Sequence, residues 1–277
     1  MSSATNFNYN GLDLNETTGY SIINADGLAG NQFRISQDNL TVMDGGNVWR
    51  RFNAMRVISL QGIILGTTVD DYFAKRNALI NTFDKDSDDL LTITLWDGSI
   101  KQIRAKCTMA PEIKDAALQI THSPFEIQLT CENPYFESTT EVTGSLAAQE
   151  AGGTPVPTPI PFPVGGANAT LSLINSSSIP VYPTITISGQ ITNAYVVNLT
   201  TGVDFTITSN VAAGSDVVVS MGPEGLGVDY EGVNWQTYFE GDIIRVEPGI
   251  NTFNFSGSSF DENALVTISF NELSLSI

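Results

Sequence analysis

The chain has 277 residues, of which 42% are hydrophobic, and its 30 acidic and 12 basic side chains give a formal net charge of −18 at pH 7. This length fits about two domains, and no run of 18 or more apolar residues is present to span a bilayer as a helix. The opening residues Met1–Phe7 lack the basic and apolar regions of a secretory signal. We therefore expect a protein that is not exported and folds where it is made.

The charge is unevenly distributed along the chain. Residues 1–134 contain 11 Lys/Arg and 16 Asp/Glu, whereas residues 135–277 contain only Arg245 against 14 Asp/Glu. A surface with one basic residue cannot neutralise a row of phosphates, which argues against nucleic-acid binding through the second half. The same negative field opposes docking on anionic lipid. We expect no specific nucleic-acid binding and no membrane association.

The first strand-like stretches predict a projecting arm and a long strand. Leu40–Val42 and Val48–Trp49 flank the turn residues Asp44-Gly45-Gly46, a pattern that indicates a hairpin. The run Met55–Leu65 also has strand character, and we expect Gly62 to break it.

One amphipathic helix is predicted next. Thr68 is a suitable N-cap, and Asp70 and Asp71 fall in the first turn, where the helix dipole favours negative charge. The apolar residues at helical spacing are Val69, Tyr72, Phe73, Leu79, Ile80 and Phe83. We expect this apolar face to cover a sheet.

Strands resume after the helix. Leu91, Ile93 and Leu95 alternate up to Asp97-Gly98, a strong signal for a hairpin turn. The returning strand is predicted over about 100–109, and a further strand over about 125–131. These elements predict a mainly β first domain over residues 1–143, an N-terminal β-sandwich or split-barrel-like fold with one α-helix.

Residues 144–167 have the composition of a linker. Their sequence is GSLAAQEAGGTPVPTPIPFPVGGA, with small residues followed by alternating prolines at positions 155, 157, 159, 161 and 163. Alternating prolines remove backbone donors and favour an extended, polyproline-like chain. The sequence therefore predicts a Pro/Gly-rich linker between the first domain and a second domain over residues 168–277.

The second domain is predicted to be all β, because short strand-like segments recur between turn signals without a helical period. The predicted strands are Leu171–Ile174, Thr184–Ser188, Ala194–Leu199, Asp204–Thr208, Asp216–Met221, Asp242–Val246, Thr252–Phe255 and Ala264–Phe270. Their spacing is typical of a two-sheet β-sandwich of the galectin-like or jelly-roll kind.

Metal-binding signatures are weak. Cys107 and Cys131 lie in strand-like alternations, so we expect buried thiols in preference to a disulfide, and together with His122 they lack zinc-ligand spacing. The run 84–89 begins like a calcium loop, but Asp89 stands where that loop needs Gly and Leu95 where it needs Glu. We expect no metal and no cofactor.

Signatures of catalysis are weak as well. His122 is the single histidine and lies in a turn-like stretch beside proline, which does not favour a nucleophile–histidine pair. No Gly-x-Ser-x-Gly elbow, phosphate-binding loop or dinucleotide-binding glycine motif is present. The sequence therefore does not predict an enzyme or any catalytic residue.

Two alternative functions involve one acidic and aromatic stretch. Its carboxylates, which glycoside hydrolysis would require in a pair, are Asp229, Glu231, Glu240 and Asp242. Its rings are Tyr230, Trp235, Tyr238 and Phe239. Such rings either stack on sugars, as in a carbohydrate-binding adhesion module for host cell-wall glycan, or pack into the core or a protein interface.

Several stretches resemble a known family in their order along the chain. In the second half they are Asn175 followed by Pro183–Gly189 (PTITISG), Asn198–Gly202 (NLTTG) and Glu247–Gly257 (EPGINTFNFSG). Near the start, Phe7–Leu14 (FNYNGLDL) and Tyr20–Ile22 (YSI) are similar to the family's opening. With these motifs the chain resembles, over most of its length, the distal tail proteins of long non-contractile-tailed (siphovirus-type) bacteriophages. The proline-rich linker departs from the family pattern.

The resemblance implies a virion protein of the tail tip or baseplate, made in the bacterial host cytoplasm and not secreted. The first domain would form a hexameric ring, single or stacked, that continues the tail tube and leaves a lumen for DNA. The second domain would be the hub for receptor-binding, fibre and other tip proteins. The predicted arm would supply ring contacts, with Arg50 and Arg51 meeting acidic neighbours or ending as solvated strand ends.

Overall fold

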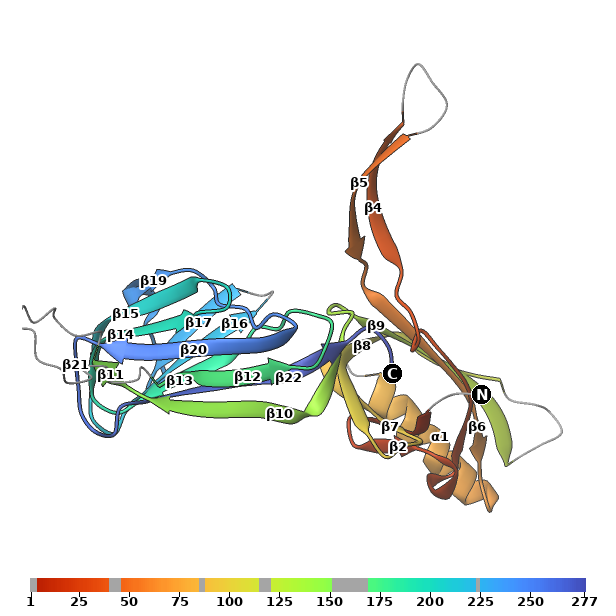
Figure 1. Cartoon of the computed structure of the whole chain (residues 1–277). Coiled ribbons are helices and arrows are strands. Elements are labelled where there is room, and N and C mark those ends of the chain that lie inside the picture. Colours follow the sequence, from red (N-terminus) through yellow and green to blue (C-terminus); the bar gives the residue numbers. More distant parts are fainter. Residues whose placement is uncertain (1–3, 40–45, 85–87, 115–120, 151–168, 223–224) are drawn as a thin grey trace, which may run out of the picture. The chain divides into compact units, whose positions relative to one another are not determined.

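The computed structural model describes residues 4–39, 46–84, 88–114, 121–150, 169–222 and 225–277 (Figure 1). The chain forms two compact units: unit 1 is Met1–Thr139 together with Ser274–Ile277, and unit 2 is Thr140–Leu273. The chain therefore leaves unit 1 once and returns to it with its last residues. In the described ranges, no helix is long and apolar enough to cross a membrane.

The division of the chain differs from the predicted one at residue 144. Strand β10 (Phe136–Ala147) continues through this position, and β11 (Gln149–Glu150) follows it and pairs with β20 (Gly249–Gly257). Gly144 is required by packing, because a Cβ at this position would lie 2.8 Å from the side chains of Leu171 and Leu173. Residues 144–147, at the start of the predicted linker, are thus strand residues of unit 2. The proline-rich part, residues 151–168, lies outside the described residues.

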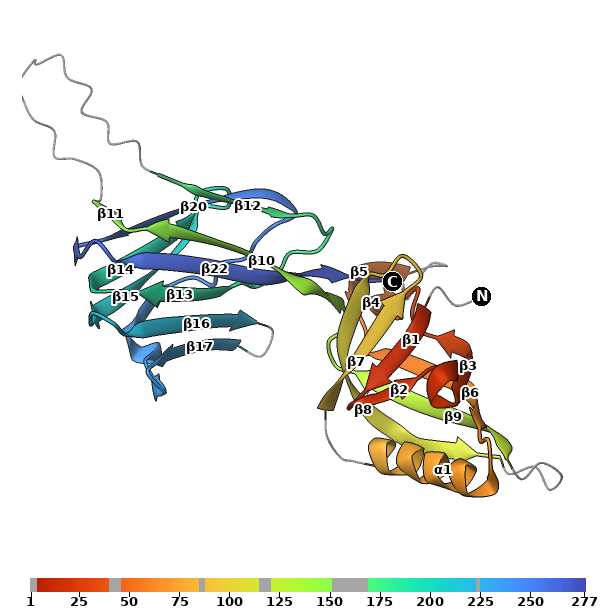
Figure 2. The same cartoon turned by 90° about the horizontal axis from the view of Figure 1, so that it is seen from below.

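Unit 1 is built on an antiparallel sheet with the order β2–β1–β7–β8–β9–β6–β3 (Figure 2). The strands are β1 (Ala4–Tyr9), β2 (Leu12–Leu14), β3 (Tyr20–Asp26), β6 (Arg56–Leu65), β7 (Asp88–Leu95), β8 (Ile100–Ile113) and β9 (His122–Cys131). Inward-facing side chains of all seven strands form one apolar core. The turn at Asp97-Gly98 joins β7 to β8 as predicted, with Gly98 at a φ of 82°.

Helix α1 (Val69–Phe83) packs beside this sheet (Figure 2). The predicted N-cap is confirmed, because the Thr68 hydroxyl accepts a hydrogen bond of 3.2 Å from the Asp71 amide. Phe83 is buried and its ring stacks on Tyr9 of β1 at 4.9 Å between centroids. The expectation that the whole apolar stripe faces the sheet is wrong for Val69 and Phe73, which are exposed.

The expected break at Gly62 is also wrong, because β6 runs without interruption from Arg56 to Leu65. The glycine is explained instead by the close approach of two neighbouring strands to its Cα. A Cβ on Gly62 would lie 2.6 Å from the Ser21 carbonyl oxygen and 2.7 Å from the Phe125 ring. The irregularity falls on the neighbouring strand β3, whose register shifts between Ile22 and Asn24.

Unit 2 is a two-sheet β-sandwich, as predicted. One sheet has the order β10–β22–β13–β16–β17–β18, and the other has the order β11–β20–β14–β15–β19, with β12 on β20 and β21 on β14. The remaining strands are β12 (Leu171–Asn175), β13 (Thr184–Ser188), β14 (Ile191–Asn198), β15 (Val203–Val211), β16 (Asp216–Gly222), β17 (Gly225–Tyr230), β18 (Val233–Asn234), β19 (Phe239–Gly241), β21 (Ser259–Phe260) and β22 (Leu265–Ser274). The apolar side chains between the two sheets form the core of this unit.

The predicted strand Asp242–Val246 is wrong, because this segment is irregular except for a single bridge between Val246 and Val181. The alternation itself is real, since Ile244 and Val246 are fully buried. Side-chain amides take the place of a neighbouring strand here. The Arg245 carbonyl accepts from Asn198 at 3.0 Å, and the Val246 carbonyl accepts from Asn175 at 3.1 Å.

The contact at Gly62 gives a prediction for stability. The substitution Gly62→Val should lower the free energy of unfolding by about 1–3 kcal/mol, because the added side chain must displace Phe125 or β3. Urea unfolding measures the change. Gly30→Ala is the control, since a Cβ there meets nothing within 4 Å. Equal stability of the two variants would contradict the close-approach explanation.

Candidate functional site

Two strands of unit 1 form an arm that stands away from its sheet (Figure 1). We call β4 (Phe33–Asn39) and β5 (Gly46–Asn53) the β4–β5 arm; within the described residues they pair with each other and with no further strand. The predicted hairpin is therefore present, although Leu40–Val42 and residues 44 and 45 of its turn lie outside the described residues. An isolated two-stranded hairpin is marginally stable in water.

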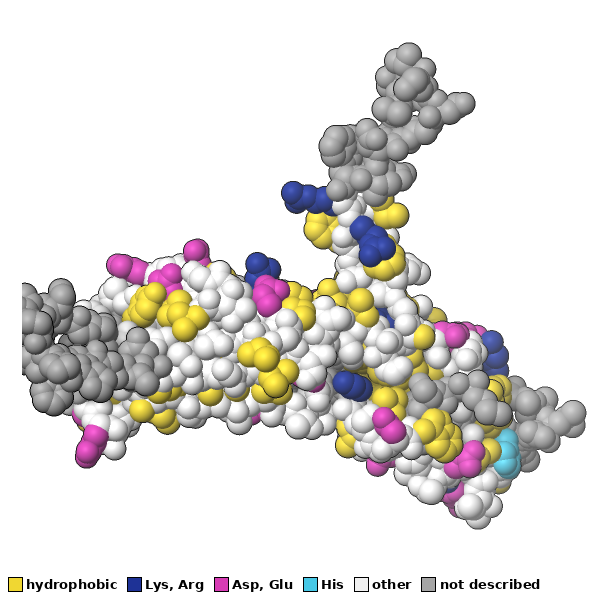
Figure 3. Space-filling view, viewed as in Figure 1, with side chains coloured by type: hydrophobic (Ala, Val, Ile, Leu, Met, Phe, Trp, Pro, Cys, Tyr) yellow, Lys and Arg dark blue, Asp and Glu magenta, His cyan; other side chains and the backbone are white. Residues whose placement is uncertain are grey.

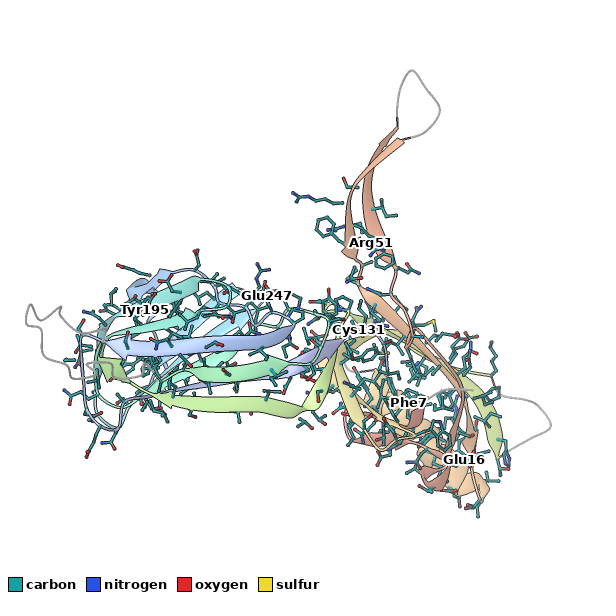
Figure 4. The ribbon with its side chains drawn as sticks, viewed as in Figure 1. Phe7, Glu16, Arg51, Cys131, Tyr195 and Glu247 are labelled. Carbon is teal, nitrogen blue, oxygen red and sulfur yellow. The ribbon has the colours of Figure 1, made fainter. Side chains whose placement is uncertain are left out.

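Hydrophobic side chains and arginines lie exposed on the described part of the arm (Figure 3). Phe33, Ile35 and Phe52 are 46%, 50% and 45% exposed. Arg51 lies on the arm (Figure 4), and its guanidinium carbon is 4.2 Å from the Phe33 ring centroid. The guanidinium carbon of Arg34 is 5.6 Å from the centroid of the Phe52 ring. The strand register places Phe33 and Ile35 on one face of the arm and Phe52 on the other, so the arm exposes apolar side chains on both faces. Exposed apolar surface of this kind marks an interaction surface.

The two arginines predicted as contact residues differ in their surroundings. Arg50 is exposed on β5, opposite Ser36, whereas Arg51 lies over the ring of Phe33. Arg51 is thus held by a cation–π contact and is not a freely solvated strand end. The exposed apolar surface continues from the arm to Met55 and to Val57 on β6.

Arg56 is buried at the root of the arm, with 1% of its surface exposed. Its guanidinium donates to the carbonyl oxygens of Gly27, Gly30 (3.0 Å) and Leu275 (2.5 Å), and Nε donates to the Pro134 oxygen (2.8 Å). Burial lowers the pKa of Arg56 from its ordinary value. In the part of the chain that the structure describes, the acceptors of this cation are backbone oxygens and not carboxylates.

Three buried asparagines brace one end of the unit 2 sandwich. Asn198 donates to the Arg245 oxygen and to Asn251 Oδ1 at 3.1 Å, and its own Oδ1 accepts from the Thr200 amide. Asn251 donates to the Glu247 oxygen at 2.6 Å and accepts from the Glu247 amide at 3.0 Å. Together with Asn175 they satisfy the backbone of the irregular segment that leads into β20, which therefore has a fixed course.

Exposed aliphatic side chains lie on the outer side of this braced end. Ile174 and Ile250 are register partners on β12 and β20, and the amide of Leu199 donates to the Thr252 oxygen on β20. These three aliphatic residues are each more than half exposed. Arg245 is exposed as well, and its carbonyl is bound by Asn198, the neighbour of Leu199. We call Ile174, Leu199, Ile250 and Arg245 the β20 face.

The aromatic residues considered for carbohydrate binding stack on one another. Trp235 lies face to face with Tyr230 at 3.9 Å between centroids and meets Tyr238 edge-on at 5.0 Å. Phe239 stacks on the buried Phe205 at 5.0 Å. Tyr230, Trp235 and Phe239 are packed against the core, so this arrangement favours the packing interpretation of these rings over a sugar platform.

The carboxylates of the hydrolase hypothesis have separate structural roles. Asp229 accepts from the Gly232 amide and Glu231 accepts from the Asp216 amide, each at 3.0 Å, so both stabilise turns around β17. Glu240 lies on β19 and Asp242 follows it, both exposed. Nothing in these positions singles out an acid and a base.

The other residues considered as ligands are not gathered into a site. Cys107 and Cys131 are free thiols, and burial raises the pKa of Cys131 to about 12. His122 begins β9 with an exposed ring, 2.8 Å from the Thr121 hydroxyl. Residues 85–87 of the acidic run lie outside the described residues, and among the described ones no group of three or more acidic, His or Cys side chains is placed to hold a metal ion.

Comparison with known proteins gives matches among solved structures. The SPP1 Dit protein, described as a paradigm of hub adsorption apparatus in phages that infect Gram-positive bacteria, has a TM-score of 0.70 at 17% identity. Chains of the phage P2 baseplate in its activated conformation match with TM-scores of 0.53 at 8% identity (with Ca) and 0.51 at 9% identity (with Sr). Each match covers 98% of this chain and 99% of the other. No protein-family model matches the chain, and no curated protein matches it.

These matches extend over both units and show that the chain has the fold of phage hub and baseplate proteins. The resemblance to distal tail proteins that the sequence motifs predict is thereby confirmed at the level of the fold. Asn175, Asn198 and Asn251 come from the three second-half stretches on which that resemblance depends. Their burial explains why asparagine is found at these positions of the chain.

The asparagine network gives a second prediction. Asn251→Ala should lower the free energy of unfolding by about 2 kcal/mol, because it leaves buried polar groups of Glu247 and Asn198 without a partner. It should also increase amide hydrogen exchange over residues 242–248. Asn254→Ala on the same strand is the matched control and should change stability by less than about 0.5 kcal/mol. Unchanged exchange in Asn251→Ala would argue against the bracing role.

Proposed function

We propose that this chain is a structural protein of a phage tail tip, whose unit 1 forms a ring and whose unit 2 carries other tip proteins. The observation that most supports this proposal is the β4–β5 arm. The fold of the chain, which matches that of SPP1 Dit over 98% of its length, supports it as well. In the virion the ring would be hexameric, would continue the tail tube and would leave a lumen for DNA.

The arm supports contact between copies for a physical reason. A two-stranded hairpin with exposed Phe33, Ile35 and Phe52 leaves apolar surface in water that a neighbouring subunit can cover. Arg34, Arg50 and Arg51 give the arm a basic surface, while the chain as a whole is strongly acidic. Electrostatic complementarity therefore favours an arm that lies on the surface of the next copy. In a closed ring, every arm makes the same contact with the next copy.

The charge of the chain suits DNA passage and does not suit DNA binding. Residues 1–134, which supply most of unit 1, have 16 acidic against 11 basic side chains, so a lumen formed by this unit would repel phosphates and would not retain DNA during ejection. The carboxylates near β17 and β19 have turn-stabilising or solvated positions. We accordingly propose a non-enzymatic role.

Unit 2 is proposed to dock other tip proteins through the β20 face. Ile174, Leu199 and Ile250 offer apolar contact area on a backbone that buried asparagines hold in place, so little conformational entropy is lost on binding. Arg245, the one basic residue in 135–277, lies at this end and is suited to pair with a carboxylate of the partner. Two copies of this face would oppose each other with like charge, which favours a different protein as the partner.

The proposal of a hexameric ring predicts that assembly is lost when the aromatic side chains of the arm are removed. Light scattering after size exclusion should give the intact chain a mass near six times 29.8 kDa. Phe33→Asn/Phe52→Asn should move the mass toward a single chain, because buried aromatic residues commonly contribute about 2 kcal/mol or more each to an interface. Val233→Asn, which changes an exposed apolar residue of unit 2, is the control. An intact chain that stays monomeric with its tail-tube neighbour present would refute the ring.

The docking proposal predicts a separate effect. When the chain is co-expressed with the other tail-tip proteins of its phage, Ile174→Asn/Ile250→Asn should reduce the recovery of one tip protein at least about tenfold. The ring should persist, because these residues belong to unit 2. Quantitative mass spectrometry of purified complexes measures the recovery, and Val233→Asn again serves as the control. Undiminished recovery of every tip protein would exclude the β20 face as the docking surface.

A further inference from the structure

The last residues of the sequence, Ser274–Ile277, return from unit 2 and occupy a seat on unit 1. Two contacts define the seat. The Leu275 carbonyl accepts a hydrogen bond of 2.5 Å from the Arg56 guanidinium, and Ile277 packs against the apolar core of unit 1. The seat is thus a binding site for an extended peptide segment, and its occupant is a named part of the same chain.

The same guanidinium also holds the root of the β4–β5 arm. Its bonds to the Gly27 and Gly30 oxygens fix the turn that precedes β4. Gly27 lies so close to β6 that a Cβ would be 2.0 Å from the Val57 carbonyl oxygen, so this turn has one position on the sheet. On the other side of the root, the Asn31 side chain donates to the Ala54 oxygen at 2.8 Å. Arg56 therefore links the seated segment to the arm through a single planar group.

The remaining acceptor, the Pro134 carbonyl, lies where the chain leaves unit 1. Pro134, whose oxygen accepts from Arg56 Nε at 2.8 Å, stands two residues before β10, the strand that leads into unit 2. The Arg56 guanidinium also lies 4.6 Å from the ring centroid of Phe136, the first residue of β10. One side chain thus contacts the outgoing connection, the returning segment and the arm root.

A buried cation makes these contacts interdependent. Because Arg56 is 1% exposed and its described acceptors are backbone oxygens, water cannot readily replace an acceptor that is lost. The remaining segments must then shift to restore the hydrogen bonds or admit solvent. The acceptor from Leu275 is also the last to be synthesised, since residues 274–277 follow the whole of unit 2 in sequence.

We propose that residues 274–277 are a latch: their seating on Arg56 fixes the root of the β4–β5 arm, so that a chain becomes a competent ring subunit only after unit 2 has been completed. The coupling rests on the proposed function, because the arm is taken as the ring contact. Its physical consequence is order in assembly, since an incomplete chain has an unfastened arm and does not join a ring early.

The test compares two variants of the full chain by amide hydrogen exchange and light scattering. Deletion of residues 274–277 removes the carbonyl acceptor, and Arg56→Lys keeps the charge but loses the planar group that reaches several carbonyls. In both, exchange over residues 27–36 and 50–54 should rise at least about tenfold, while residues 184–188 of unit 2 stay protected. Combining the two changes should add little to Arg56→Lys alone, because that variant already lacks the guanidinium that binds the Leu275 oxygen.

Ser276→Glu is the matched control, because it changes an exposed side chain and keeps the backbone of the segment. It should leave the exchange at the arm root and the oligomeric mass unchanged. Arg56→Lys keeps the full length of the chain, so the contribution of the guanidinium can still be measured where the shortened chain does not fold.

The results separate the latch from the ring. Unchanged exchange at the arm root in the deletion variant would overturn the latch, even where Arg56→Lys loosens the root through its own bonds to Gly27 and Gly30. Unchanged exchange in Arg56→Lys would overturn it as well, and so would an equal rise over the whole of unit 1, which would show general destabilisation. A monomeric intact chain whose arm root still loosens on deletion would refute the ring and retain the latch contact. Loosening at the arm root together with a mass shifted toward the single chain is the expected outcome.

Discussion

The burial of one guanidinium is the constraint on which unit 1 depends. Arg56 has four described backbone acceptors in place of a carboxylate, and they come from three different stretches of chain. A carboxylate would satisfy the charge from one position, whereas carbonyls at Gly27, Pro134 and Leu275 satisfy it only when three distant segments converge. The planar group thus requires a particular course of the chain at the arm root and at both connections to unit 2.

The two units use polar groups in contrasting ways. In unit 2, three buried and neutral asparagines replace strand partners for an irregular segment, which holds the β20 face rigid. In unit 1 a buried charge fastens an arm that has no further strand beside it in the described structure. This contrast suits the proposed ring subunit, because the proposed docking platform must be stable alone, whereas the arm could gain its stability from a neighbouring copy.

Sequence reasoning recovered the features that short-range patterns encode. The hairpin at Asp97-Gly98, the N-cap at Thr68 and most strands of unit 2 follow from turn chemistry and alternation, and the structure confirms them. It failed where a distant neighbour decides the outcome. Gly62 is predicted to break its strand, but the glycine is explained by the close approach of Phe125 from a neighbouring strand. Asp242–Val246 alternates like a strand, but asparagine side chains and not a neighbouring strand supply hydrogen bonds to it.

The sequence by itself determined a mainly β chain with one helix, an acidic second half and a projecting hairpin, because composition and periodicity are local properties. Its motifs also indicated the fold of distal tail proteins, which the comparison with SPP1 Dit bears out. Only the tertiary structure decided that residues 274–277 belong to unit 1, that Arg56 is buried and that the aromatic residues near Trp235 stack on one another. These outcomes depend on contacts between residues as far apart as Arg56 and Leu275, and no local pattern along the chain records such contacts.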